Sequence, residues 1–490
     1  MIVSSLLALV PFSQAPAPEL HALELRATDG TVVRAERGRL EVPERRANPE
    51  TRRIELAFLR LCSPAERPLA PVVFLAGGPG GAATPGADEP EAVQGWLPLL
   101  AHHDVILLDQ RGTGASCPNL EWRSDQPVPV DLLLDEGVAL DFARTVAVRA
   151  LAHFREQGVD LAGYTTVESA DDLESLRVAL GYQKLSLLGF SYGTHLALAT
   201  MKRHGARLER VVLIGTEGLD QTYKLPSTYD RQLARLAALV ARDPEVGGEV
   251  PDLTALLGKV LAQLEEEPLE VVLRDPATGA DELYPVGPWG LRFLLRLDLG
   301  DGNDFPVFPR LLRSIEARDP RLLAWFVQKR LRGFAGTSAM AVVMDYASGA
   351  SPERLERIAR EQRASLFANT MNFPFPAVGE GLDLPDLGAE YRAPFASDVV
   401  ALFLSGTLDC QTPPEQAEEQ RARMPRATHL VVANAGHEDI LPMPEAQAAV
   451  AAFLRGEDVS GRTLALPAPR FVPLIGARPS PSHPCLEGVR

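Results

Sequence analysis

The stretch Leu185-Ser-Leu-Leu-Gly-Phe-Ser-Tyr-Gly-Thr194 decides the fold of this chain. It opens with a short aliphatic run, which is typical of a strand buried on both faces. The segment 192–204 that ends the stretch has the length and spacing of a helix. Between the two, Gly189 to Gly193 matches G-x-S-x-G, the pattern in which a serine occupies a strained turn between strand and helix. This context predicts that Ser191 is a nucleophile.

Compact apolar runs alternate with helical patterns on both sides of this stretch. The runs with the character of buried strands are 72–76, 105–108, 211–214, 399–404 and 430–432, and shorter strands are expected at 39–43 and 54–59. Segments 136–157 and 169–180 have helical length and spacing. The alternation predicts an α/β fold in which helices cover both faces of a mainly parallel central sheet.

The alternation stops between about residues 218 and 394, where Leu, Ala, Arg and Glu dominate, and it resumes near Asp398. We therefore expect residues 18–217 and 397–490 to form the two parts of one α/β core, the second ending in a Pro-rich tail. Residues 218–396 are expected to form a large, mainly helical cap inserted into that core. Residues 1–17 are interpreted as a signal segment or a disordered start.

Composition narrows the classes of function. Hydrophobic residues make up 46% of the 490 residues and charged residues 23%, as in globular proteins in general. The formal net charge of −16 would repel a phosphate backbone, so nucleic acid is not an expected partner. No stretch approaches the roughly 18 apolar residues of a membrane-spanning helix.

Residues 3–12 form a short apolar run, and small residues follow it at Ser13-Gln14-Ala15. If this is a signal peptide, the protein is secreted or periplasmic; otherwise it is cytoplasmic. Cys62, Cys117, Cys410 and Cys485 permit three disulfide pairings if all are oxidised. Free thiols are the alternative, and the sequence leaves both open.

A serine nucleophile needs a base, and the base needs an orienting carboxylate. On a sheet of this kind the order along the chain is Ser, then Asp or Glu, then His, each at the carboxyl end of a strand. Asp409 follows the expected strand 399–404, and His437 follows the strand 430–432, whereas His429 falls within a strand. We therefore expect Ser191, Asp409 and His437 to form a catalytic triad.

The negative charge on an attacked carbonyl oxygen needs two preorganised amide donors, each contributing about 3 to 4 kcal/mol. The amide of Tyr192, directly after the nucleophile, is one expected donor. The other is Gly78, in the loop Ala76-Gly-Gly-Pro-Gly-Gly81 that follows an early strand.

The same loop allows a dinucleotide-binding interpretation. Residues 78–83 fit G-x-G-x-x-A, and Asp109 ends the next strand. However, Pro79 removes one amide from a phosphate cradle, and the prolines at 85 and 90 delay the helix that should face a pyrophosphate. The oxyanion-hole interpretation is therefore preferred.

Three segments together, Gly77–Gly80, Asp109–Gly114 and Gly189–Thr194, resemble the proline iminopeptidase and tripeptidyl aminopeptidase family of α/β-hydrolases. The similarity extends to residues 164–173 and to Gly406-Thr-Leu-Asp409 with Thr412-Pro413. It implies the α/β-hydrolase fold with a helical cap over the active site, and cleavage from the free amino terminus of a peptide. It also implies that no metal or organic cofactor is needed. Ala76 stands where the smaller proline iminopeptidases have His, which favours the tripeptidyl branch.

Matched to the family motifs, Ser191, Asp409 and His437 are the triad, and Gly78 and Tyr192 form the oxyanion hole. Selectivity for an amino terminus also needs a carboxylate that pairs with the substrate ammonium group. Glu217, which follows the strand after the nucleophile strand, is a candidate, and an ordinary hinge charge is the alternative.

Two carboxylates of the insertion, Glu380 and Glu390, cannot be ranked from sequence as ammonium ligands. We interpret Arg111 as a structural residue that pairs with Asp109. His195 is interpreted as a packing or surface residue.

The most specific hypothesis from sequence is therefore a serine peptidase that acts as an aminopeptidase on peptides with a free amino terminus. A second hypothesis keeps the triad but takes an ester or another small acyl compound as substrate, because fold and triad do not choose among acyl groups. A third is a non-catalytic binding protein with the same fold.

Overall fold

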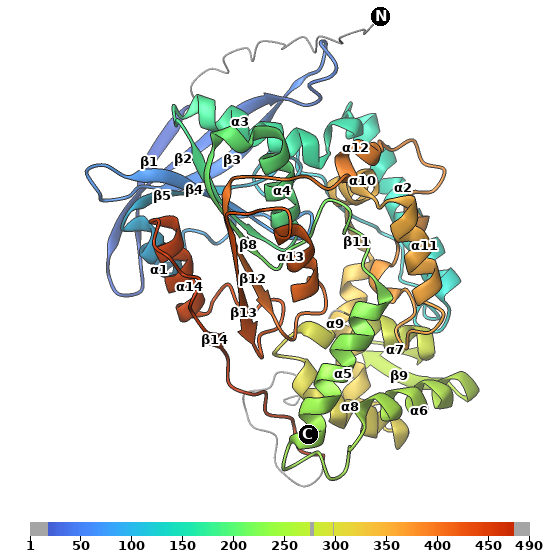
Figure 1. Cartoon of the computed structure of the whole chain (residues 1–490). Coiled ribbons are helices and arrows are strands. Elements are labelled where there is room, and N and C mark those ends of the chain that lie inside the picture. The colour runs from blue at the N-terminus through green and yellow to red at the C-terminus, as the bar shows by residue number, and fades with distance from the viewer. Residues whose placement is uncertain (1–17, 275–278, 297, 475–490) are drawn as a thin grey trace, which may run out of the picture.

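The computed structural model describes residues 18–274, 279–296 and 298–474 (Figure 1). A ten-stranded sheet runs through the molecule. Across the sheet, the strands are β1 (Leu20–Arg26), β2 (Val32–Pro43), β3 (Arg53–Leu61), β5 (His103–Leu108), β4 (Leu69–Leu75), β7 (Leu185–Phe190), β8 (Leu208–Ile214), β12 (Val400–Gly406), β13 (Ala427–Ala433) and β14 (Leu464–Ala465). In this order, the first four strands, β1 to β5, pair antiparallel with one another. From β5 onward across the sheet, each strand pairs parallel with the next. The predicted α/β fold with a mainly parallel sheet is confirmed.

Alternate residues of the central strands pack on opposite faces of the sheet, as the two-residue period of a strand requires. In β8, for example, Val211 and Leu213 join one hydrophobic cluster and Val212 and Ile214 the other. The first cluster includes side chains of α3 (Thr166–Ala179) and α4 (Tyr192–His204). The second includes α1 (Pro90–Leu100) and α14 (Pro444–Leu454). Both faces are therefore covered (Figure 1).

The segment after β8 is mainly helical and lies beside one end of the sheet (Figure 1). Its helices are α5 (Pro226–Arg242), α6 (Leu253–Glu266), α7 (Pro288–Leu295), α8 (Phe308–Glu316), α9 (Arg321–Phe334), α10 (Ala339–Ser348), α11 (Pro352–Glu361) and α12 (Gly388–Arg392). The structure adds two small antiparallel sheets that the sequence did not predict. One pairs β9 (Leu269–Arg274) with β10 (Asp281–Val286), and the other pairs β11 (Gly336–Ser338) with β6 (Glu121–Arg123).

The hydrophobic core of this region is not built from residues 218–396 alone. It also contains Phe142 and Val146 of α2 (Glu136–Glu156), together with Leu408 and Phe471. Side chains from outside residues 218–396 are therefore buried in the same core as side chains from inside that range. This packing holds the helical region against the rest of the chain.

The carboxyl ends of the parallel strands lie at one edge of the sheet, where ligands bind in folds of this type. The loops that follow β4, β7, β12 and β13 all leave from that edge. The last of these strands is followed in turn by α14, and α13 (Pro414–Arg421) follows the loop after β12. These loops carry the residues singled out above.

Two predictions from the sequence concern the cysteines and the amino-terminal apolar run. Cys62, Cys117 and Cys410 are free thiols, so no disulfide joins any two of these three, while Cys485 lies outside the described residues. The apolar run 3–12 also lies outside them. None of the helices within the described ranges combines the length and the apolar character needed to cross a bilayer.

The predicted structural role of Arg111 holds, but its predicted partner is wrong. Its guanidinium is fully buried and donates to both carboxylate oxygens of Asp172, at 2.8 and 2.7 Å. It also donates to the backbone carbonyls of Glu44 and Gly163, at 2.6 and 2.5 Å. Asp172 lies on α3, far away in sequence, which is why a local pairing with Asp109 seemed the simpler expectation. Arg111 thus connects β2, α3 and the turn before α3.

We expect Arg111→Met to lower the free energy of unfolding by about 3 to 5 kcal/mol, because it leaves buried acceptors without their donor. Denaturant unfolding followed by circular dichroism measures this change. Arg37→Met is the matched control, since Arg37 forms an exposed ion pair with Asp88 and should change the free energy by less than about 1 kcal/mol. Equal effects of the two substitutions would contradict the structural role.

Candidate active site

Ser191 adopts a backbone conformation that few non-glycine residues tolerate, with φ 53° and ψ −126°. Hydrogen bonds on both sides of the residue hold it there. Its amide donates to the Ile214 carbonyl at 2.9 Å, and its own carbonyl accepts from the amide and the hydroxyl of Thr194 at 2.8 and 2.7 Å. The turn therefore presents the Ser191 hydroxyl at the edge of the sheet, where the residue is half-buried.

The two glycines of the motif are required by close backbone contacts. A Cβ on Gly193 would lie 2.0 Å from the Leu75 carbonyl oxygen, and a Cβ on Gly189 would lie 2.5 Å from the Gly193 carbonyl oxygen. No side chain fits at such distances, so α4 can start directly against β4 and β7 only because both positions lack one.

The structure brings the three residues of the expected triad together. His437 Nε2 lies 3.0 Å from Ser191 Oγ, and His437 Nδ1 lies 2.9 Å from Asp409 Oδ2. Both side chains beside the serine are buried, with Asp409 1% and His437 5% exposed. In this arrangement the imidazole can accept the proton of the hydroxyl. The carboxylate can then stabilise the imidazolium that forms.

The Asp409 carboxylate is fixed by its own loop. Oδ1 accepts from the amides of Gln411 and Thr412 at 2.8 and 2.9 Å, and Oδ2 accepts from the Thr412 hydroxyl at 2.6 Å. Burial alone would raise the pKa of Asp409, but His437 and the bonds from Thr412 outweigh it, so the pKa lies below its usual value. The carboxylate is therefore ionised beside the imidazole.

The opposite balance applies to His437. Burial lowers the pKa of His437 and so does the nearby Lys224, but the Asp409 carboxylate raises it more, and the net pKa lies above 6.5. The ring also packs against Phe190, with the ring centroids 5.1 Å apart. The imidazole is thus oriented both by a charge partner and by an aromatic neighbour.

The expected oxyanion donors come from two segments near the serine, the loop after β4 and the start of α4. Gly78, in the exposed part of its loop, follows Gly77, whose Cβ position would be 2.9 Å from Ser191 Cβ. The Tyr192 amide is in the first turn of α4. Within the described residues, neither amide donates to another protein group. Both are therefore free to donate a hydrogen bond to an oxyanion.

Asp109 shapes the same loop and argues against the dinucleotide interpretation. Its carboxylate accepts from the amides of Ala83, Thr84 and Ala115 at 2.7, 2.9 and 2.8 Å, and from the Thr84 hydroxyl at 2.5 Å. Asp109 is therefore saturated by the loop and has no free oxygen for a ribose. In addition, α1 begins only at Pro90, so no helix starts at the glycines.

Glu217 is placed near the triad but already has partners. One carboxylate oxygen contacts the Lys224 ammonium, and the other lies 3.4 Å from His195 Nδ1. His195 is fully buried and also lies 2.6 Å from the Tyr391 hydroxyl, so it links α4 to α12. The predicted packing role of His195 thus has a specific contact. Glu380 and Glu390 are exposed.

The helical region also supports His437 directly. The His437 amide donates to the Gly300 carbonyl at 2.8 Å, and the neighbouring Gly436 amide donates to Asp439 at 2.6 Å. Gly300 belongs to the short 3-10 helix η3 (Asp298–Gly300) within residues 218–396. The position of the imidazole therefore depends on a segment of the insertion.

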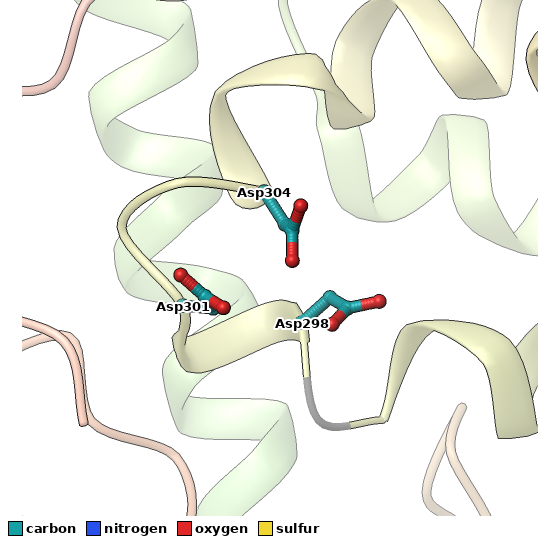
Figure 2. Close-up of side chains that lie close together, drawn as sticks. All are labelled: Asp298, Asp301 and Asp304. Carbon is teal, nitrogen blue, oxygen red and sulfur yellow. The ribbon is translucent and has the colours of Figure 1, made fainter. Parts of the chain in front are cut away.

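Three carboxylates surround the turn that contains Gly300: Asp298, Asp301 and Asp304 (Figure 2). Among the described residues, they form the group of side chains that could hold a metal ion. However, the Lys329 ammonium contacts both Asp298 and Asp304, and the Arg330 guanidinium contacts Asp298. Burial raises the pKa of Asp298 to about 7, even though Arg330 and Lys329 lower it. This arrangement is an ion network around the turn whose Gly300 carbonyl accepts from the His437 amide.

Several residues of the site were missed from sequence. Thr412 is three residues after Asp409, a spacing at which a hydroxyl and a carboxylate often share a turn, and this signal could have identified it. Lys224 and the Gly300 carbonyl belong to the insertion, where no motif or period marks them. Their role depends on tertiary packing alone.

Comparison with known proteins agrees with this geometry. Residues 70–265 match a family model described as alpha/beta hydrolase fold, and residues 388–462 match one described as TAP-like protein. The serine protease Hip1 of Mycobacterium tuberculosis is 30% identical over 193 residues, which cover 36% of this chain and 35% of that protein.

Two further relatives carry peptidase names. The tripeptidyl aminopeptidase of Streptomyces lividans is 30% identical over 176 residues, covering 32% of this chain and 31% of the relative. A probable proline iminopeptidase of Streptomyces coelicolor is 28% identical over 178 residues, covering 34% and 42%. The chain thus spans between about a third and two fifths of the length of these relatives. The chain has the α/β-hydrolase fold, and its resemblance to the proline iminopeptidase and tripeptidyl aminopeptidase family is confirmed.

Proposed function

We propose that this protein is a serine hydrolase that acts as an aminopeptidase and releases residues or short peptides from a free amino terminus through an acyl-enzyme. The observation that carries the proposal is the hydrogen-bonded chain Ser191–His437–Asp409 on a strained elbow. The peptidase names of the relatives support the choice of peptides as substrate class.

In the proposed mechanism, His437 Nε2 takes the proton of the Ser191 hydroxyl as Oγ attacks the scissile carbonyl carbon. The amides of Gly78 and Tyr192 donate to the oxyanion. The imidazolium, stabilised by Asp409, then protonates the leaving amine, and the C–N bond breaks. A water molecule, deprotonated by His437, hydrolyses the Ser191 ester and restores the free serine.

The preference for a free amino terminus requires a negative group near the triad, since a buried ammonium without a partner is costly. Glu217 is the carboxylate that we propose from sequence for this task, and its 7% exposure and contact with Lys224 make it part of a charged group beside α4. An incoming ammonium group would share the Glu217 carboxylate with Lys224, whereas an acetylated end brings no charge to it.

The proposed function predicts a strong preference among three substrates. A tripeptide p-nitroanilide with a free amino terminus should have a kcat/KM at least about tenfold higher than its N-acetylated form, because the acetylated form loses a charge-assisted hydrogen bond. It should also be preferred over p-nitrophenyl acetate. Release of nitroaniline or nitrophenol, followed by absorbance, gives all three rates.

Ser191→Ala is the control for these assays, and it should lower kcat by several powers of ten without unfolding the protein. Equal rates with free and acetylated peptide would reject the aminopeptidase and leave an ester or acyl hydrolase. If the wild-type protein neither turns over any of these substrates nor reacts with a fluorophosphonate probe, it is a binding protein.

The raised pKa of His437 predicts how the rate depends on pH. The protonated imidazole cannot accept the serine proton, so kcat/KM should fall as the pH drops through that pKa, with the half-maximal rate above pH 6.5. A neutral ester substrate assayed from pH 5 to 9 avoids titration of the substrate. Asp409→Asn should move the midpoint of the residual rate to lower pH, because the charge that raises the pKa is gone. A flat profile between pH 5 and 8 would contradict the role of His437.

Thr412→Val should lower kcat by about 5- to 30-fold with little change in KM. The substitution keeps the shape of the side chain but removes the hydroxyl that donates to Asp409 Oδ2, a bond of about 1 to 2 kcal/mol. Steady-state kinetics on the free peptide measures the effect. Thr412→Ser keeps the hydroxyl and should retain most of kcat, and a loss of the same size in both variants would show that only packing is affected.

A further inference from the structure

A cavity of about 370 Å³ lies between α1 and α14, two helices that run side by side over one face of the sheet (Figure 1). Its floor includes the strand residues Leu107, Leu188 and Ile214, which are between 1% and 3% exposed. Its mouth includes the exposed Gly95 and Pro442. Among the described residues that line the cavity, none belongs to the triad or the oxyanion hole. The reaction described above therefore does not use it.

The lining of the cavity is almost entirely apolar. It includes the half-buried rings of Phe74 and Trp96, whose centroids are 5.3 Å apart, and the side chains of Leu441, Ala446 and Val450. Protein interiors leave few voids larger than a water molecule, and water in an apolar recess lacks hydrogen-bond partners. An apolar group that displaces such water gains binding free energy. The cavity is therefore suited to the apolar part of a ligand.

The sequence of α1 keeps this space open. Residues 91, 92, 95, 98 and 99 all line the cavity and share one face of the helix, with Gly95 in the middle of that face. A Cβ on Gly95 would meet open space. Glycine inside a helix is less favourable than alanine. The helix thus gives up stability at a position where a side chain would enter the cavity.

The polar groups at the cavity are acidic or accept hydrogen bonds. Glu91 lines it and is exposed, and it forms no ion pair within the described residues. A carboxylate oxygen of Glu89 lies 3.7 Å from where a Cβ on Gly86, another lining residue, would be. Gln447 Nε2 donates to the Leu441 carbonyl at 3.1 Å, which leaves Gln447 Oε1 available to a donor. None of the described lining residues is Lys or Arg. A cationic donor is therefore favoured here over an anion.

We propose that this cavity binds a small molecule that has an apolar ring or chain and a primary ammonium head. The apolar part fills the space between α1 and α14, and the head lies at the mouth beside Glu91 and Gln447 Oε1. The volume is at the lower end of the range for small-molecule sites, about 300 to 1,000 Å³, so the occupant is one small molecule and not a segment of a protein. The site is separate from the proposed aminopeptidase reaction and does not depend on it.

The test uses three naphthalene derivatives that share the ring system and differ in the head group: naphthylmethylamine, naphthylmethanol and naphthylacetate. Isothermal titration calorimetry with the full chain, at neutral pH and low salt, measures each Kd. We expect one site per chain. The amine should bind about two- to fivefold more tightly than the alcohol, because an exposed ion pair contributes modestly, and the acetate should bind most weakly. Glu91→Gln should bring the Kd of the amine to that of the alcohol.

Gly95→Leu fills the cavity and should raise the Kd of the amine at least about tenfold, because the leucine takes the space of the ring. Leucine also favours a helix, so this variant should be at least as stable as the wild-type protein. Gly258→Leu is the matched control. Gly258 lies within α6, where a Cβ would also meet open space, and it does not line the cavity. Its Kd should stay within twofold of the wild-type value.

Absence of binding for all three compounds would overturn the site. So would a Kd that Gly95→Leu leaves within twofold, because the amine would then bind elsewhere, for example at the triad. Tighter binding of the acetate than of the amine would overturn the assigned charge. A wild-type dimer that Gly95→Leu dissociates, as measured by light scattering, would show that a second copy of the chain covers the cavity, and this too would overturn the proposal. If Gly95→Leu does not fold, as judged by circular dichroism, Gly95→Met replaces it under the same criteria.

Discussion

The arrangement of the site depends on how closely backbone approaches backbone around Ser191. The serine has a positive φ because the chain must reverse from β7 into α4 within one residue, and the contacts of Gly189 and Gly193 allow the helix to start against two strands. The cost of that conformation is of order 1–3 kcal/mol. The hydrogen bonds to Ile214 and Thr194 offset it. Everything else in the site is positioned relative to this turn.

Sequence reasoning was most effective where local pattern and topology coincide. Aliphatic runs of strand length predicted the parallel sheet, and the rule that strand ends meet at one edge predicted that Ser191, Asp409 and His437 would lie close together, as their contacts show. The same reasoning missed the partner of Arg111, because Asp172 approaches it only through the packing of α3 on the sheet. It also missed the small sheets around β6 and β9, whose strands are too short and too polar to stand out among helical segments.

The insertion contributes more to the site than a cover. Gly300 supplies an acceptor for the His437 amide, Met344 accepts from Tyr192, and Tyr391 contacts His195 on the elbow helix. These contacts join distant parts of the chain, and none of them has a sequence signature. They explain why Glu217 could be named from the strand pattern as a candidate ammonium ligand, while its partner Lys224 could not.

The bond between the Gly300 carbonyl and the His437 amide limits how the molecule can admit a substrate. If residues 218–396 moved away as one rigid body, that bond would break and the imidazole would lose its support together with its alignment to the hydroxyl. The η3 turn, with its ion network, must therefore stay in place during turnover, and any movement that admits a substrate has to involve other parts of the insertion. One part of the insertion, the η3 turn, thus keeps the proton acceptor aligned. Movement that admits a substrate is left to the rest of the insertion.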